Sequence, residues 1–301
     1  MRFKLLTAVA ALLALMCACA CAEERLNIVC TDFPCFDFAR QVAGDRADVA
    51  MLLKPGVEPH AFEPTPADIL SIGEADLFVY IGGESDAWAD GILSGFDGAD
   101  APAILRMMAC VSDPVEEAGH DHDDGPEYDE HIWTAPENAA KMVRAVADAL
   151  TALDGAHARY YADNADAYCA QIDEIDAQIR EIVEGAARRE LVFADRFPFA
   201  YFTRAYGLDH LAAFSSCTAD TEPSAQIVMA LIQKVVEDRI PAVYTIEMST
   251  QAIARTVAEE TGAQILTLHS MQTVTQKEYE DGASWVSIMR DNVEALRKGL
   301  N

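Results

Sequence analysis

The sequence has few basic residues. Lysine and arginine together number 22 against 50 aspartates and glutamates, so the formal net charge is -28. Once Arg2 and Lys4 are set aside with the N-terminal segment discussed below, 20 basic residues remain. Such a charge argues against binding to nucleic acid and against an electrostatic attachment to anionic lipid. It suits a protein that gathers cations, and it equally suits one that is simply highly soluble.

Cysteine patterns that mark thiolate metal cages are also missing. Five cysteines follow residue 22, and no two of them form a CxxC pair, so a zinc cage built from thiolates is not expected. One disulfide involving Cys30, Cys35 or Cys110 would fit an oxidising compartment, but the sequence does not give its connectivity. Cys217 is interpreted as a buried thiol or a disulfide partner.

Long apolar runs are absent after the N-terminus. Residues 1–22 combine a basic start, an apolar run from Leu5 to Met16 and small residues, which is typical of a signal peptide. Cleavage near Ala20 or Ala22 fits, and so does a lipoprotein with its lipid on Cys19 or Cys21. We therefore expect the protein to be secreted across the cytoplasmic membrane. It would be either periplasmic or held by a lipid on the outer face of that membrane.

The remaining residues alternate between strand and helix patterns, which predicts an α/β fold with mainly parallel sheets. We expect two lobes, at residues 23–150 and 189–301, each with helices flanking its sheet. A helical stretch without proline at 151–188 predicts one long helix that joins them. An acidic segment with histidines at 113–130 interrupts the first lobe and is predicted to be a loop.

Three of the seven histidines lie where a ligand site is expected. His60 follows a strand in a polar turn, His131 ends the acidic segment, and His269 lies at the C-terminal end of a strand. Ligands of open α/β sheets bind at that end of the strands. Imidazole nitrogen and carboxylate oxygen are ligands that Zn²⁺ prefers, but no HExxH motif is present and the spacing alone does not identify a site. For His157 and His210 we expect structural roles.

Several motifs occur in the order found in a known family. They are GDRADVAMLLKPGVEPHAFEPTPADILSIGEADLFVYIGG, HIWTAPENA, YFTRAYGL, TEPSAQIVMALIQKV and the closing segment from Trp285 to Leu300. Through them most of the chain resembles the cluster A-I substrate-binding proteins, which are the zinc and manganese receptors of ABC importers. The resemblance implies two lobes with limited relative motion, because a rigid helix joins them.

The resemblance also implies a metal site, with His60 and His131 as the first two ligands. The family's third ligand, a His or Glu, aligns with Arg196, which cannot bind a metal, so the neighbouring Asp195 is predicted to substitute. His269 stands where the family often has an Asp. The predicted set is therefore His60, His131, His269 and Asp195, with Glu247 or water as alternatives for the fourth place. Three imidazoles favour zinc over manganese.

The acidic segment resembles a short form of the His-rich loop of zinc receptors. His120 and His122 would then gather Zn²⁺ weakly, whereas the alternative is a solvated loop with incidental histidines.

We predict a monomeric receptor that captures Zn²⁺ between its lobes and delivers it to the permease of an ABC importer, without enzymatic activity or nucleic-acid binding. The alternatives are a zinc-dependent hydrolase and a surface adhesin or zinc buffer.

Overall fold

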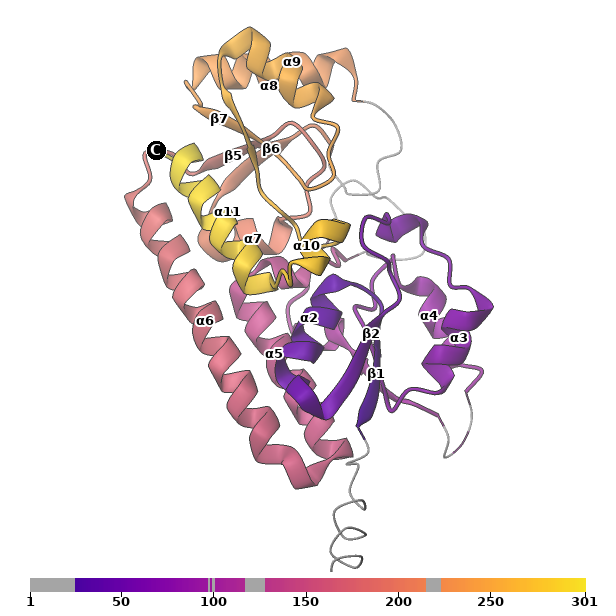
Figure 1. Ribbon diagram of the computed structural model, residues 1–301. Coiled ribbons are helices and arrows are strands. Elements are labelled where there is room, and N and C mark those ends of the chain that lie inside the picture. The colour runs from indigo at the N-terminus through magenta and orange to yellow at the C-terminus, as the bar shows by residue number, and fades with distance from the viewer. Residues whose placement is uncertain (1–24, 97, 99–100, 117–127, 215–222) are drawn as a thin grey trace, which may run out of the picture.

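The computed structural model describes residues 25–96, 98, 101–116, 128–214 and 223–301 (Figure 1). The signal segment, His120, His122 and Cys217 lie outside these residues. Within the part of the chain that the structure describes, no helix combines the length and apolar character needed to cross a bilayer.

Two parallel four-stranded sheets form the centres of two lobes (Figure 1). The first sheet has the order β2-β1-β3-β4, from β1 (Leu26–Cys30), β2 (Ala47–Met51), β3 (Leu77–Tyr80) and β4 (Ala103–Arg106). The second has the order β6-β5-β7-β8, from β5 (Glu190–Phe193), β6 (Asp209–Ala212), β7 (Ala242–Thr245) and β8 (Gln264–Thr267). The predicted fold class is thereby confirmed.

Helices cover both sheets and connect them. They are α2 (Phe33–Ala43), α3 (Pro66–Gly73), α4 (Ala87–Leu93), α5 (Pro136–Leu153), α6 (Ala158–Gly185), α7 (Ala200–Tyr206), α8 (Ala225–Glu237), α9 (Ala252–Thr261), α10 (Gln276–Glu280) and α11 (Trp285–Gly299). Sequence patterns mark several helix starts: Pro66 and Pro136 occupy first turns, and Thr65, Thr275 and Ser284 form capping boxes.

The long helix α6 runs beside α5 along one side of the molecule (Figure 1). Its apolar positions recur at helical spacing, and the buried ones include Tyr168, Ile172, Ile175 and Ile179. The C-terminal helix α11 packs against α6 and also against α2 of the first lobe. One hydrophobic core, from Ile28 to Leu300, therefore extends through both lobes.

Asp37 ties three of these helices together. Its carboxylate is fully buried and accepts hydrogen bonds from Tyr168 Oη of α6 at 2.6 Å and from Trp285 N of α11 at 2.8 Å. Arg40 of α2 lies 2.8 Å from the same carboxylate. Burial and the Asp37 charge raise the pKa of Tyr168 far above its usual value, so the phenol stays protonated and donates.

The cysteines do not form a disulfide among the described residues. Cys30, Cys35, Cys110 and Cys169 are all free thiols. Burial raises the pKa of Cys30 and Cys35 above that of an exposed thiol, which keeps both protonated and disfavours a role as metal ligands.

Replacing Asp37 with alanine should lower the free energy of unfolding by about 3 kcal/mol, because Trp285 N and the hydroxyl proton of Tyr168 would then lose their buried acceptor. Chemical denaturation of the purified protein would measure the change. The matched control is Asp163→Ala on α6, whose pair with Arg159 is exposed and should contribute less than about 1 kcal/mol. Equal losses in the two variants would contradict the structural role of Asp37.

Candidate metal site

Two of the four side chains predicted as ligands, His60 and His131, come together where the lobes meet. Among the described residues, one group of three His, Cys, Asp or Glu side chains has ligand atoms that all lie within 4.8 Å of one another. It consists of His60, Glu130 and His131. The imidazole centroids of the two histidines are 6.5 Å apart. Glu130 was not among the predicted ligands.

Local turns bring these residues to the site. His60 lies in a 3-10 turn, Pro59–Ala61, between β2 and α3. Glu130 and His131 directly precede a second 3-10 turn, Ile132–Thr134, which leads into α5. Tyr201 of α7 holds the approach to this turn, since its hydroxyl donates to Asp129 O at 2.9 Å and accepts from Val115 N at 3.1 Å.

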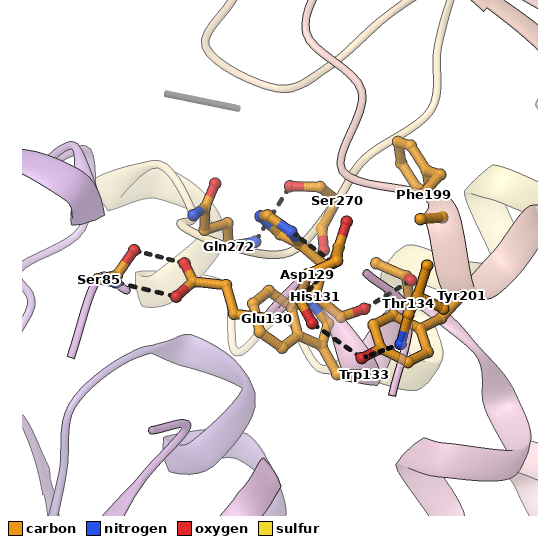
Figure 2. A network of polar contacts seen from close by, with 12 residues as sticks. Ser85, Asp129, Glu130, His131, Trp133, Thr134, Phe199, Tyr201, Ser270 and Gln272 are labelled. Atoms are coloured by element: carbon orange, nitrogen blue, oxygen red, sulfur yellow. Dashed lines mark hydrogen bonds and ion pairs between the residues drawn. The ribbon is translucent and has the colours of Figure 1, made fainter. Parts of the chain in front are cut away.

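Ser85 connects His60 to Glu130. Figure 2 shows Glu130 directed at Ser85, whose backbone N donates to Glu130 Oε2 at 2.9 Å and whose hydroxyl donates to Oε1. Since that hydroxyl proton is used, Ser85 Oγ accepts from His60 Nδ1, 2.8 Å away. A side chain at Gly83 would collide with Glu130, so the residue at this position has to be glycine.

These hydrogen bonds set the protonation of both imidazoles. A proton on His60 Nδ1 leaves the Nε2 lone pair for another partner. His131 Nδ1 lies 3.0 Å from Asp129 Oδ1. A carboxylate oxygen can only accept a hydrogen bond, so His131 also carries its proton on Nδ1. Both histidines therefore present Nε2 as an electron-pair donor, the arrangement found in metal-binding histidines.

A residue of the second lobe, Gln272, contacts His60. Gln272 lies beside Glu130 in Figure 2, and its side-chain nitrogen is 3.0 Å from His60 Nε2. With His60 protonated on Nδ1, the amide of Gln272 donates to that nitrogen. Arg196, the position at which the family pattern has a ligand, instead pairs with Glu58 of the first lobe at 3.3 Å.

Buried carboxyl groups lie behind the group, around a small cavity of about 20 Å³. Asp86 accepts from Ile81 N at 2.7 Å, and burial together with the Glu130 charge raises its pKa to about 6. Asp32 accepts from Cys35 N at the start of α2, and burial together with the Asp86 charge raises its pKa to about 8. The reason in both cases is that water no longer solvates the ionised form.

His269 lies outside this group of three and faces other partners. Its Nδ1 is 3.5 Å from Glu247 Oε2, and its Nε2 is 3.7 Å from Glu278 Oε1. Burial opposes protonation, but the two carboxylates outweigh it and raise the pKa of His269, while His269 lowers the pKa of Glu278 to about 2. Glu247, the alternative fourth ligand, accepts from Ser270 N at 2.7 Å.

Asp195 follows β5 and is also outside the group. Its Oδ1 accepts from Arg196 N at 2.9 Å, and the side chain lines a separate cavity in the second lobe. His157 and His210 have the structural surroundings expected of them: His157 Nδ1 lies 2.7 Å from Asp154, and His210 stacks on Phe197 with centroids 3.7 Å apart.

The raised carboxyl pKa values make stability depend on pH. A carboxyl whose pKa is higher in the folded than in the unfolded protein destabilises the fold as it ionises. For Asp32 this loss should develop from about pH 4, near the unfolded pKa, to about pH 8. Asp32→Asn keeps the helix cap and removes the charge. In metal-free protein, the free energy of unfolding of the variant should therefore rise relative to that of the parent by more than about 1 kcal/mol from about pH 4 to about pH 8.

Urea denaturation at a series of pH values would test this, with the exposed Asp48→Asn as the control. Parallel stability profiles for the parent and Asp32→Asn would contradict it.

Comparison with known proteins agrees with this architecture. The family model described as zinc-uptake complex component A, periplasmic, matches residues 28–299. Over 92% of its length the chain is 32% identical to the zinc-binding lipoprotein AdcA of Streptococcus pneumoniae, of which it spans 56%, little more than half. It is 28% identical to the high-affinity zinc uptake system protein ZnuA of Bacillus subtilis and covers 88% of that protein.

The solved structures point the same way. The Zn(II)-bound ZnuA-like domain of Streptococcus pneumoniae AdcA superposes with a TM-score of 0.77 at 29% identity, covering 92% of this chain and 99% of that domain. The chain belongs to the family of periplasmic A components of zinc-uptake complexes, the zinc-type cluster A-I substrate-binding proteins that its motifs resemble.

Proposed function

We propose that this protein captures Zn²⁺ between its two lobes and delivers it to the permease of an ABC importer. The observation that carries the proposal is the group of half-buried His60 with buried Glu130 and His131, in which both imidazoles are held with Nε2 as the electron-pair donor. Zn²⁺ binds well to two imidazole nitrogens and a carboxylate oxygen, with one further position open. Family membership and the names of the relatives support zinc as the cargo.

The proposed ligands are His60, His131 and Glu130. Glu130 is 5% exposed and His131 2%, so an ion bound here would be largely withdrawn from water. Ser85 and Asp129 would hold the ligands in place, as hydrogen-bond partners of metal ligands usually do. Asp195 and His269 stay predicted ligands whose contribution the titration below would measure.

The location of the protein and its partners belong to the same proposal. Its relatives are named as lipoproteins and as a component of a zinc uptake system. We infer export through residues 1–22, a lobe division at 23–150 and 189–301 around the helical segment 151–188, and a permease as the partner. A receptor of this kind needs to bind and release its cargo and has no need for catalysis.

Calorimetric titration of the metal-free protein with Zn²⁺ should show one tight site. His60→Ala, His131→Ala and Glu130→Gln should each weaken binding at least about 100-fold, because each removes one of few ligands. His157→Ala is the control, since that histidine pairs with Asp154 beside α6. Loss of binding in His269→Ala or Asp195→Asn would support the four-residue set predicted from sequence instead, and no tight site at all would overturn the zinc proposal.

Gln272→Glu should tighten Zn²⁺ binding by about tenfold or more. The side chain is 7% exposed and its amide already lies against His60 Nε2, so a carboxylate there would bring an anionic oxygen to the ion in a poorly solvated place. Competition with a chelator of known affinity would measure the change. Gln272→Ala, which removes the amide without adding charge, should not tighten binding, and an unchanged Gln272→Glu would place Gln272 outside the ion's reach.

A further inference from the structure

The second lobe contains a cavity that is not lined by His60, Glu130 or His131. Its volume is about 860 Å³, and it lies between α8, α9 and the segments that follow β5 and β7. This volume is in the range of pockets that hold small organic molecules. Its apolar wall is formed by Phe214, Val228, Met229, Ile232, Met248 and Ile253.

The position of the cavity in the sheet is one where ligands bind. The strand order β6-β5-β7-β8 means that the chain leaves β5 toward one edge of the sheet and leaves β7 toward the other. A crevice forms outside the C-terminal ends of two such strands. Ala194 and Asp195, directly after β5, and Met248 and Ser249, shortly after β7, line the cavity.

Asp195 gives the cavity a polar anchor. Its side chain is part of the lining and is only 8% exposed. Oδ1 accepts from Arg196 N, but Oδ2 is buried and has no hydrogen-bond partner among the described residues. A buried carboxylate oxygen without a donor is unfavourable, so a ligand that donates a hydrogen bond here gains more than it would at a solvated carboxylate. The carboxylate therefore keeps unused acceptor capacity beside the cavity.

The charges around the cavity determine which sign of charge is favoured on a ligand. Asp195, Glu260 and Arg196 line the cavity, and the guanidinium of Arg196 pairs with Glu58, so the carboxylates of the lining outnumber its one cation. The whole chain carries a formal charge of -28. An organic cation is therefore favoured over an anion of the same shape.

The rim of the cavity suits a ligand with a flexible apolar chain. Met229 is 62% exposed and Met248 54%, although both are large apolar side chains. Methionine adapts its shape to different partners and is common at surfaces that bind apolar groups. The methyl groups of Met229 and Met248 also offer a direct spectroscopic reporter of whether the cavity is occupied.

We propose that this cavity binds a small organic cation, with a primary ammonium on Asp195 and an apolar chain between α8 and α9. The site is distinct from the group of His60, Glu130 and His131, and its existence does not depend on zinc binding.

The test is a titration of the metal-free full chain, with chelator present, using n-octylammonium and octanoate as matched probes. Methyl NMR of Met229 and Met248 would report binding. Octylammonium should shift both signals saturably, with octanoate at least tenfold weaker. Asp195→Asn should weaken octylammonium at least fivefold without weakening octanoate, and Ile232→Trp, which narrows the apolar part of the cavity, should weaken both.

Equal affinity for the two probes, or octylammonium affinity unchanged in Asp195→Asn, would overturn the proposal, and so would the absence of saturable shifts. If Asp195→Asn does not fold, the charge preference of the parent protein and the effect of Ile232→Trp decide the question. The readout contains no zinc, so a failed zinc titration would leave it intact.

Discussion

Trp133 joins the two lobes beside the candidate metal site through its indole and its backbone carbonyl. It is 1% exposed and lies two residues after His131. Its indole Nε1 donates to Ser270 O after β8 at 2.7 Å, and its carbonyl accepts from the indole of Trp285 in α11 at 2.9 Å. The turn that presents Glu130 and His131 is thereby joined to two separate segments of the second half of the chain. Because these contacts are buried and shared, large relative movement of the lobes would break them together.

Sequence patterns predicted most of the elements that place the site. The alternation of strand and helix patterns predicted the parallel sheets, and helical spacing without proline marked α6. Short elements were missed: β4 alternates between partly buried and exposed residues, and α4 and α10 are seven and five residues long. Segments of that length contain too few periods for a pattern to stand out.

The prediction of metal ligands also depended on how distinctive each residue is in the sequence. His60 and His131 were predicted as ligands because they lie in motifs that resemble those of a known family, whereas their spacing alone did not identify a site. Glu130 is one of 50 acidic residues, and only its hydrogen bonds to Ser85 distinguish it. His269 was correctly placed just after a strand, but the sequence does not show that Glu247 and Glu278 lie on either side of its ring. Such contacts depend on tertiary packing between segments distant in sequence.

The two lobes have the same strand order, but the crevice at the C-terminal ends of the strands is filled differently in each lobe. In the first lobe, Asp32 after β1 and Asp86 after β3 close the crevice to about 20 Å³ and surround it with carboxyl groups. In the second, apolar side chains of α8 and α9 leave about 860 Å³ open. A dense acidic crevice can support ligands of a small cation because little water remains to compete with them. The second lobe meets the candidate metal site through the segment after β8, where Gln272 lies against His60, and not through this open crevice.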